Sequence, residues 1–471
     1  MAGKSTPLSP VDAGWFHMDG PTNLAMVAGV IMTNAPLSVT RVKEVFTHRL
    51  LPFERFRQRV VERGMPFPVP HWEDDPHFDI DAHIRHIALP APGDEAALLD
   101  LLSDLASTPL DYNRPLWQLH IIDGVPNGGA LVLRFHHCVA DGTAMMAVAP
   151  QVFDATPNAP VTPHVARPSA PPGGLLDRLA AAAQRAMSRS TQFVEESTDL
   201  LRNPGRVRQI GQGAVYHVAV AASTLLKESD PPSVFKGKVG TAKRVAWSHP
   251  LPLAQVKAVG AASGAKVNDV LVATMTGALR HYMQERQETV DGLTIRAVVP
   301  VNLRSPHRAL ELGNQFGIAF LDLPIGLASA EERLRLTKQA MDSIKSSGEA
   351  TVFMNIIGLF GMSPKIVEDV GIGIFGTKAT LAFTNVVGPR ERLFLAGAAV
   401  ERIIFWVPHP GTLGLGISIL SYNDEVTLGI VADAGLVPDP ERIAALFGYE
   451  FARLWSASHP ATDATSAGTL L

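Results

Sequence analysis

A strand-like segment and a helix-like segment meet at residues 136–142, and the turn between them carries two histidines and an aspartate. The apolar run 130–135 reads Ala-Leu-Val-Leu-Arg-Phe, the turn reads His-His-Cys-Val-Ala-Asp-Gly, and a second apolar run follows at 143–148. A junction between a strand and a helix is a place where a sheet can point side chains into a cleft. Histidine titrates near neutral pH, so one of these imidazoles can accept and return a proton during turnover.

Other interpretations of this turn are open on the residues alone. A His-His pair is often solvated at a surface or satisfied near a core. Zinc needs three or four ligands, and no His-Glu-x-x-His or Cys-x-x-Cys lies nearby, so we expect no metal. Cys138 is the only cysteine in the chain. Neighbouring strand residues point to opposite faces, so if His137 faces the cleft, Cys138 is expected to be a buried packing residue and not a nucleophile.

The length and composition predict a large protein with much apolar surface. A chain of 471 residues exceeds one ordinary core, so two domains are expected. Charged residues make up 18%, below the ~25% of an average protein, which predicts apolar surface that is either buried or offered to lipid. A net charge of −4 gives no field for nucleic acid. A single cysteine and an N-terminus without an apolar signal core favour a cytoplasmic protein.

The pattern along the chain predicts three parts. These are an N-terminal subdomain over 1–155, a Pro-rich linker with crossover helices over 156–240, and a C-terminal subdomain over 241–471. Six prolines lie between residues 157 and 172, which is typical of a linker. Periodicity predicts strands near 25–32, 130–135, 293–301, 381–387, 414–420 and 424–431, and helices near 96–105, 253–260, 268–284 and from 175 onward.

No segment is a convincing membrane span. Residues 209–226 carry no charge but contain too many polar residues, and the apolar stretch 352–360 is too short. Each is expected to be either a helix packed in the core or a segment that touches a bilayer or a lipid droplet.

Six further segments narrow the interpretation of the histidine turn. In chain order they are Leu8-Ser9-Pro10-Val11-Asp12 followed by Phe16, Pro115-Leu116-Trp117, Asn268-Asp269, Pro300-Val301-Asn302-Leu303-Arg304, Asn314-Gln315-Phe316-Gly317, and Thr384-Asn385-Val386-Val387-Gly388-Pro389. The turn itself is similar to the HHxxxDG signature of coenzyme-A-dependent acyltransferases and condensation domains. With the six segments, the chain resembles the bacterial wax ester synthase/diacylglycerol acyltransferase family from about residue 7 to about residue 455.

The resemblance implies a fold and a reaction. The fold is two chloramphenicol-acetyltransferase-like α/β subdomains with a substrate tunnel between them. The reaction is transfer of a long-chain acyl group from acyl-coenzyme A, a cosubstrate, to diacylglycerol or a long-chain alcohol, with no bound cofactor and no metal. We also expect peripheral contact with the inner membrane or a lipid droplet. The preference between the two acceptors stays open.

The resemblance assigns roles within the turn. His137, the second histidine, is the expected general base, and His136 is a neighbour that orients or shapes the site. Asp141 is expected to ion-pair with Arg304 and hold the turn in place. Gly142 either permits close approach of substrate or backbone, or is a simple helix-start glycine.

The resemblance also assigns roles outside the turn. Asn268 is the expected donor to the oxyanion. Without the resemblance, Asn268 is equally well explained as a helix cap. Asp269 is expected to cap the helix that begins there. Pro115, Leu116 and Trp117 are expected to be structural, with Trp117 against the tunnel wall. Thr384 and Asn385 are expected either to donate hydrogen bonds near the site or to close a strand end.

Two other functional classes share this turn. One is a condensation-type enzyme that takes carrier-bound thioesters, and the other is a catalytically silent lipid-binding protein of the same fold. The order of the Pro-Leu-Trp and Asn-Asp segments disfavours the first class. The intact histidine turn disfavours the second.

Overall fold

The computed structural model describes residues 5–63, 69–161, 227–304, 312–346, 349–361, 363, 365–409 and 411–459. The described residues up to 161 and from 228 onward belong to one compact unit. The helix predicted from residue 175 and the uncharged stretch 209–226 lie outside the described residues.

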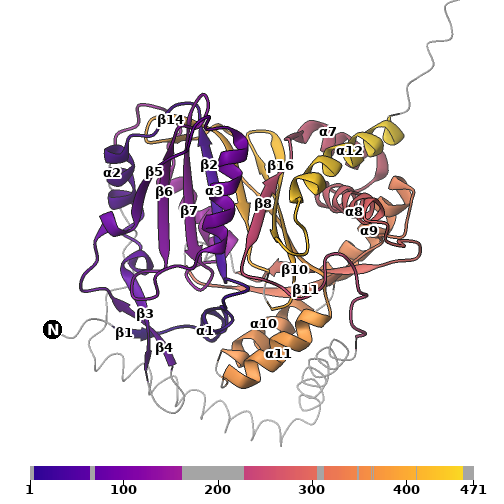
Figure 1. Ribbon diagram of the computed structural model, residues 1–471, viewed down its shortest axis with the longest axis horizontal. Helices are drawn as coiled ribbons and strands as arrows, with labels where there is room; N and C mark the ends of the chain where they lie inside the picture. Colours follow the sequence, from indigo (N-terminus) through magenta and orange to yellow (C-terminus); the bar gives the residue numbers. More distant parts are fainter. Residues whose placement is uncertain are drawn as a thin grey trace, which may run out of the picture. The chain divides into compact units, whose positions relative to one another are not determined.

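A six-stranded sheet forms the first half (Figure 1). Its order is β13-β14-β2-β7-β6-β5, with β13 at Phe394–Leu395, β14 at Ala398–Trp406, β2 at Met26–Thr33, β7 at Gly129–His136, β6 at Trp117–Asp123 and β5 at Ile84–Ala88. A small antiparallel sheet stands beside it, built from β1 (Ser5–Pro7), β4 (Val69–Asp74) and β3 (Gln58–Arg63). The short 3₁₀ helix η1 (Glu54–Arg57) leads into β3, and η2 (Ile80–Ala82) lies between β4 and β5.

Two strands of the first sheet, β13 and β14, come from the other end of the sequence. β14 pairs antiparallel with β2 over most of its length, with Phe405 opposite Gly29 and Ile403 opposite Ile31. The N-terminal sheet therefore contains residues from the segment 241–471, which was predicted to form the C-terminal subdomain. The boundaries predicted at 155 and 240 themselves remain predictions.

Helices cover both faces of the first sheet. α3 (Glu95–Ser107) packs its apolar stripe on one face, and the cluster there includes Leu98 and Leu102 with Val132 of β7. α1 (Pro10–His17), α2 (Val39–Arg49) and α4 (Gly142–Val152) contribute to the core on the opposite side. Successive strand residues face opposite sides, so β2 and β7 each contribute to both cores.

A second sheet forms the other half. Its order is β11-β10-β12-β15-β16-β8, with β9 (Leu251–Pro252) beside β16; the bounds are β11 Phe316–Leu323, β10 Ile295–Asn302, β12 Leu381–Val387, β15 Leu415–Tyr422, β16 Glu425–Asp433 and β8 Lys243–Trp247. Asn423 and Asp424 both adopt positive φ, at 50° and 60°, and make the tight turn between β15 and β16.

Six helices complete this half. They are α7 (Leu253–Ser263), α8 (Val267–Glu285), α9 (Ala330–Ser346), α10 (Glu349–Phe360), α11 (Lys365–Thr377) and α12 (Pro440–Ser458). α8 is buried on nearly every side because α7, α9 and α12 all pack against it. α10 packs against β11 and α1, so the apolar stretch 352–360 is a core helix, the first of the two predicted alternatives.

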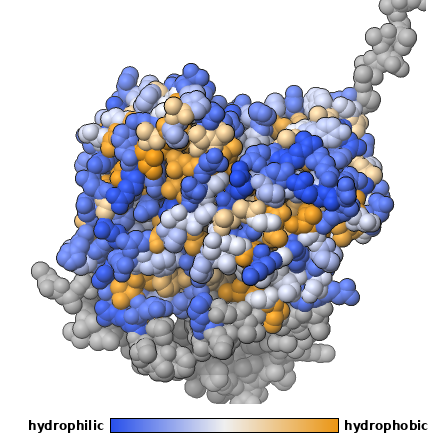
Figure 2. Space-filling model, viewed as in Figure 1, coloured by the Kyte–Doolittle hydropathy of each residue, from blue (hydrophilic) through white to orange (hydrophobic). Residues whose placement is uncertain are grey.

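No helix in the described part of the chain is long and apolar enough to cross a bilayer. Apolar residues reach the surface as separate patches among hydrophilic ones (Figure 2).

Candidate active site

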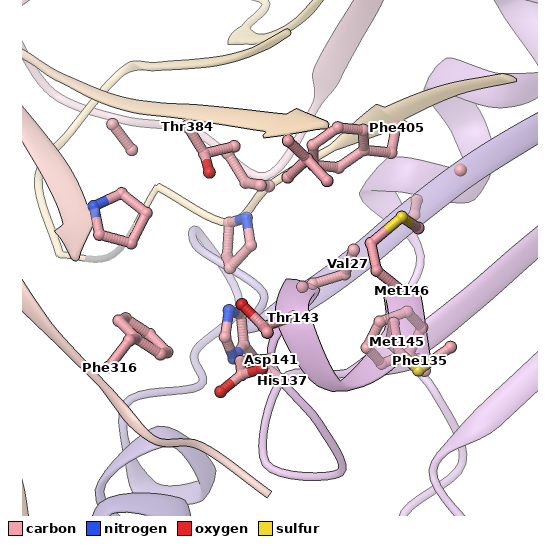
Figure 3. A pocket seen from close by; sticks show the side chains of 18 of the residues that line it. Val27, Phe135, His137, Asp141, Thr143, Met145, Met146, Phe316, Thr384 and Phe405 are labelled. Atoms are coloured by element: carbon pink, nitrogen blue, oxygen red, sulfur yellow. The ribbon is translucent and has the colours of Figure 1, made fainter. Parts of the chain in front are cut away.

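A mostly apolar cavity of about 390 Å³ runs through the middle of the compact unit and is lined by both halves. Its N-terminal arm is formed mainly by α4 and the first sheet, with Gly29, Ile31, Leu131, Leu133, Met145, Val148, Val152 and Phe405. Its C-terminal arm is formed by α10, α11 and the second sheet, with Val298, Ile318, Phe320, Phe353, Ile356, Phe375 and Phe383. Figure 3 shows the His137 ring with Phe316 on one side and Met145 on the other.

The backbone holds His137 on the wall of the cavity. β7 ends at His136, so His137 lies in the turn that follows the strand, and its N–H donates to the carbonyl of Ala25 at 2.7 Å. The strand alternation used to place Cys138 therefore does not apply at this position. The expected outcome nevertheless holds, because Cys138 is fully buried and burial raises the pKa of its thiol well above the ordinary value.

The imidazole of His137 is enclosed by aromatic rings. Trp15 of α1 stacks on it with ring centroids 4.1 Å apart and an angle of 11° between the planes, and Phe316 lies 5.6 Å away. Burial in these surroundings lowers the pKa of His137 below its ordinary value, because the charged form loses its hydration. His137 is therefore a neutral imidazole at neutral pH.

Asn314 and Asp12 complete the surroundings of the ring. His137 Nδ1 lies 2.8 Å from Asn314 Oδ1, and Asn314 Nδ2 donates to Asp12 Oδ1 at 2.7 Å. Both residues belong to segments that supported the family resemblance, but nothing in those segments places them beside the histidine. Trp15 was also missed, since an isolated tryptophan in a helix carries no sequence signal for a ring stack.

Asp141 makes the predicted ion pair with Arg304. Arg304 Nη2 lies 2.7 Å from Asp141 Oδ2, and both side chains are almost fully buried. Asp141 also caps α4 by accepting the N–H of Ala144 at 2.8 Å, and it accepts the N–H of Gln315 at 2.9 Å. One carboxylate thus joins the histidine turn, the start of α4 and the strand that begins at Phe316.

His136 points away from the cavity and is not among its lining residues. Its Nδ1 accepts the backbone N–H of Cys138 at 3.1 Å, which tightens the turn, and its Nε2 lies 3.8 Å from Asp19. Complete burial lowers the pKa of His136 to about 3. The geometry therefore supports the expected shaping role of His136 and gives it no path to a substrate in the cavity.

Gly142 begins α4 at the cavity wall. A Cβ on Gly142 would meet only the Cγ2 of Val386, 3.9 Å away on β12, which is ordinary contact. The fold alone therefore does not require glycine here.

The predicted residues of the second half meet at the start of α8. Asp269 caps this helix as expected, because its carboxylate accepts the N–H of Lys266 at 2.9 Å. Asn268 accepts a hydrogen bond from Asn385 Nδ2 at 2.7 Å, and it is Asn385 with Thr384, not Asn268, that lines the cavity. Asn268 therefore reaches the cavity through Asn385.

Pro115, Leu116 and Trp117 are buried behind the cavity wall. The carbonyl of Leu116 accepts the N–H of His136 at 2.9 Å, which anchors the end of β7. Trp117 pairs in register with the cavity-lining Phe135, but it does not line the cavity itself; its indole donates to the carbonyl of Phe56. These residues support the wall from the next strand.

Two paired α/β halves around a shared cavity, with a histidine turn from the first half, form a fold of the chloramphenicol-acetyltransferase type. Residues 8–271 match the wax ester synthase/diacylglycerol acyltransferase catalytic domain, and residues 312–454 match the WS/DGAT C-terminal domain. The chain belongs to this family of acyltransferases, which confirms the resemblance drawn from the motifs.

Similarity to individual proteins agrees with this family. A probable diacylglycerol O-acyltransferase, tgs1, of Mycobacterium tuberculosis is 27% identical over 446 residues, which cover 93% of each chain. The wax ester synthase/diacylglycerol acyltransferase of Marinobacter aquaeolei VT8 superimposes with a TM-score of 0.67 at 22% identity, over 96% of this chain and 100% of that one. The first condensation domain of the calcium-dependent antibiotic synthetase shares the fold, with a TM-score of 0.60 at 16% identity, over 98% and 99% of the two chains.

Proposed function

We propose that this protein transfers a long-chain acyl group from acyl-coenzyme A to the hydroxyl of diacylglycerol or of a long-chain alcohol, with His137 as the general base. The observation that carries the proposal is the neutral His137 ring on the wall of a mostly apolar cavity to which each half of the protein contributes an apolar arm. Each arm offers an apolar environment for an alkyl chain, so two lipid substrates can present their polar ends to one imidazole.

The proposed reaction uses the free nitrogen of His137. Nδ1 is occupied by Asn314, so Nε2 accepts the hydroxyl proton while the oxygen attacks the thioester carbonyl. The new C–O bond forms, the C–S bond breaks, and the imidazolium returns its proton to the departing thiolate. General-base help of this kind contributes ~10²–10⁴-fold to the rate. The enclosed apolar site also keeps out water, which would compete with the alcohol.

The intermediate oxyanion needs a donor, and Asn385 is the proposed one. One N–H of its amide is held by Asn268, which fixes the amide plane while the side chain lines the cavity. The family motif around Asn268 would then act by orienting Asn385. Loss of one oxyanion donor costs ~10²–10³ in rate.

Contact with a membrane or lipid droplet is also proposed. Two exposed apolar side chains directly follow cavity-lining residues: Val387, 79% exposed, follows Val386, and Leu303, 36% exposed, follows Asn302. Such residues can rest on a lipid surface while substrate enters. The test is sedimentation with phosphatidylglycerol vesicles, in which Val387→Asp should reduce binding and unchanged binding would refute this role.

The central test measures thiol release from palmitoyl-coenzyme A with hexadecanol or with diacylglycerol as acceptor, followed by chromatographic separation of the products. His137→Ala should abolish release, whereas His86→Ala, a change at a half-exposed surface histidine on β5, should not. Full activity of His137→Ala would refute the base assignment. Absence of release by the native protein with both acceptors would refute the proposed reaction and favour carrier-bound thioesters or lipid binding.

A further inference from the structure

Three segments far apart in the sequence meet on the Nδ1 side of His137. Asn314 Nδ2 donates to Asp12 Oδ1 at 2.7 Å and to the backbone carbonyl of His137 at 2.8 Å, while Asn314 Oδ1 lies 2.8 Å from His137 Nδ1. The carboxylate and the carbonyl can only accept, so the NH₂ of the amide must face them and its oxygen must face the ring. An amide oxygen is an acceptor only, so His137 Nδ1 must carry the proton.

We infer that Asn314 and Asp12 are positioning residues for acyl transfer, which together hold His137 in the Nδ1–H tautomer and leave the lone pair of Nε2 for the acceptor hydroxyl. The inference rests on the proposed role of His137 as the base. It assigns no contact with substrate to Asn314 or Asp12.

Helix α1 supplies both the anchor of this arrangement and the stack on the ring. Asp12 and Trp15 are three residues apart, so they lie on one face of α1, and that face meets Asn314 and His137. Asp12 is buried and is fixed from behind by Ser9, whose hydroxyl donates to Asp12 Oδ2 at 2.6 Å. The backbone N–H of Asn314 donates to Asp12 Oδ1 at 2.9 Å, so the carboxylate holds both the backbone and the side chain of residue 314.

The backbone before Asn314 is shaped for this approach. Gly313 has φ +99°, which L side chains rarely adopt, and a Cβ there would lie 3.1 Å from Asp12 Oδ2. Glycine therefore lets the chain pass against the carboxylate and turn the Asn314 amide toward the histidine.

An amide between the ring and the carboxylate transmits orientation without placing a charge against Nδ1. The charged or titratable groups around the ring are Asp12 behind Asn314, Asp141 in its pair with Arg304, and the neighbouring His136. A carboxylate directly on Nδ1 would favour the imidazolium and make the base less available at neutral pH. The amide keeps the ring neutral and correctly oriented at the same time.

The test compares four variants of the full chain by thiol release and by ¹⁵N NMR of ring-labelled histidine. The first variant, His137→Ala, identifies the His137 signals in the spectrum. Asn314→Leu removes the acceptor at similar size. Asp12→Asn keeps the size but removes the charged acceptor, so that the His137 carbonyl alone fixes the orientation of the Asn314 amide. Arg333→Met is the control, because it removes a buried ion pair with Glu450 in the second half, away from the cavity.

We expect Asn314→Leu to lower kcat by at least ~10²-fold, toward the ~10⁴-fold loss known for a catalytic histidine held in the wrong tautomer, with little change in KM for acyl-coenzyme A. Asp12→Asn should give a smaller loss, and Arg333→Met should lower thermal stability but leave kcat within a few-fold. In the native protein Nδ1 should carry the proton, and in Asn314→Leu the proton should shift toward Nε2.

Two results would overturn the inference. One is a kcat for Asn314→Leu within a few-fold of the native value while His137→Ala is inactive. The other is an unchanged Nδ1–H tautomer in that variant. If Asn314→Leu fails to fold, Asp12→Asn decides by the same two readouts. Full activity of His137→Ala would instead refute the proposed function, so the two failures are distinguishable.

Discussion

Arg304→Met isolates what the Asp141–Arg304 ion pair contributes. The substitution removes two hydrogen bonds from one nitrogen, to Asp141 Oδ2 and to the carbonyl of Gly313, both at 2.7 Å. Removing one partner of a buried pair costs ~3–5 kcal/mol. Asp141 keeps the N–H groups of Ala144 and Gln315, so we expect the lower end, a loss of about 3 kcal/mol in the free energy of unfolding.

The loss is measurable as a shift of the melting temperature. An average unfolding entropy of ~2.1 cal/mol/K per residue, scaled to a chain of 471 residues, converts that loss into a drop of about 3 °C. Arg333→Met is the matched control, because Arg333 forms a buried pair with Glu450 among α8, α9 and α12, away from the cavity. Both variants should lower the melting temperature, but only Arg304→Met should also slow thiol release by the folded protein.

A double-mutant cycle tests whether the two residues act as a pair. Asp141→Ala and Arg304→Met together should cost less than the sum of the single losses, by ~0.5–3 kcal/mol. Strictly additive losses would show that the ion pair contributes no coupling. Equal slowing of thiol release in Arg304→Met and Arg333→Met would show that it does not hold the catalytic turn.

Four further outcomes follow from the site. Gly142→Ala should leave the melting temperature unchanged or slightly raised but should raise KM, and unchanged kinetics would identify Gly142 as a simple helix-start residue. Cys138 should resist alkylation in the native protein and react after denaturation, because it is buried and its thiol pKa is raised. A general base must be neutral, and burial lowers the pKa of His137. Thiol release should therefore persist below pH 6.5 and fall only as the pH drops through that lowered pKa. A loss of activity that begins above pH 6.5 would contradict this expectation. In the folded protein the pKa of His136 is lowered to about 3, whereas in the unfolded chain His136 protonates near its ordinary 6.5. Between these pH values the unfolded state binds more protons than the folded state. The free energy of unfolding should therefore decrease as the pH is lowered from 6.5 to about 3.

The sequence predicted much of the fold because its signals were periodic. The strand predicted at 381–387 matches β12, and the predicted helix 268–284 differs from α8 by one residue at each end. β14 was missed, since a mixed polar and apolar strand gives no clean alternation and its partner β2 lies far back in the sequence. Pairing over that distance leaves no local signal.

The site was predicted only in part. His137, Asp141 and Arg304 carry charge or proton chemistry, so residue type and motif order led to them. Asn314 and Trp15 matter through where the fold puts them, since an amide acts here only because a carboxylate and a carbonyl fix its orientation. Asn385 was named, but its place in front of Asn268 depends on how β12 meets α8.

The crossing of β14 into the first sheet bears on how the chain is made. A ribosome completes the histidine turn early, yet β2 has an unpaired edge until residue 406 has emerged, and open sheet edges invite pairing with other chains. An N-terminal fragment that carries the whole HHxxxDG motif would therefore be prone to aggregate. Dividing this protein into two separately expressed halves would require the strand 398–406 to travel with the first half.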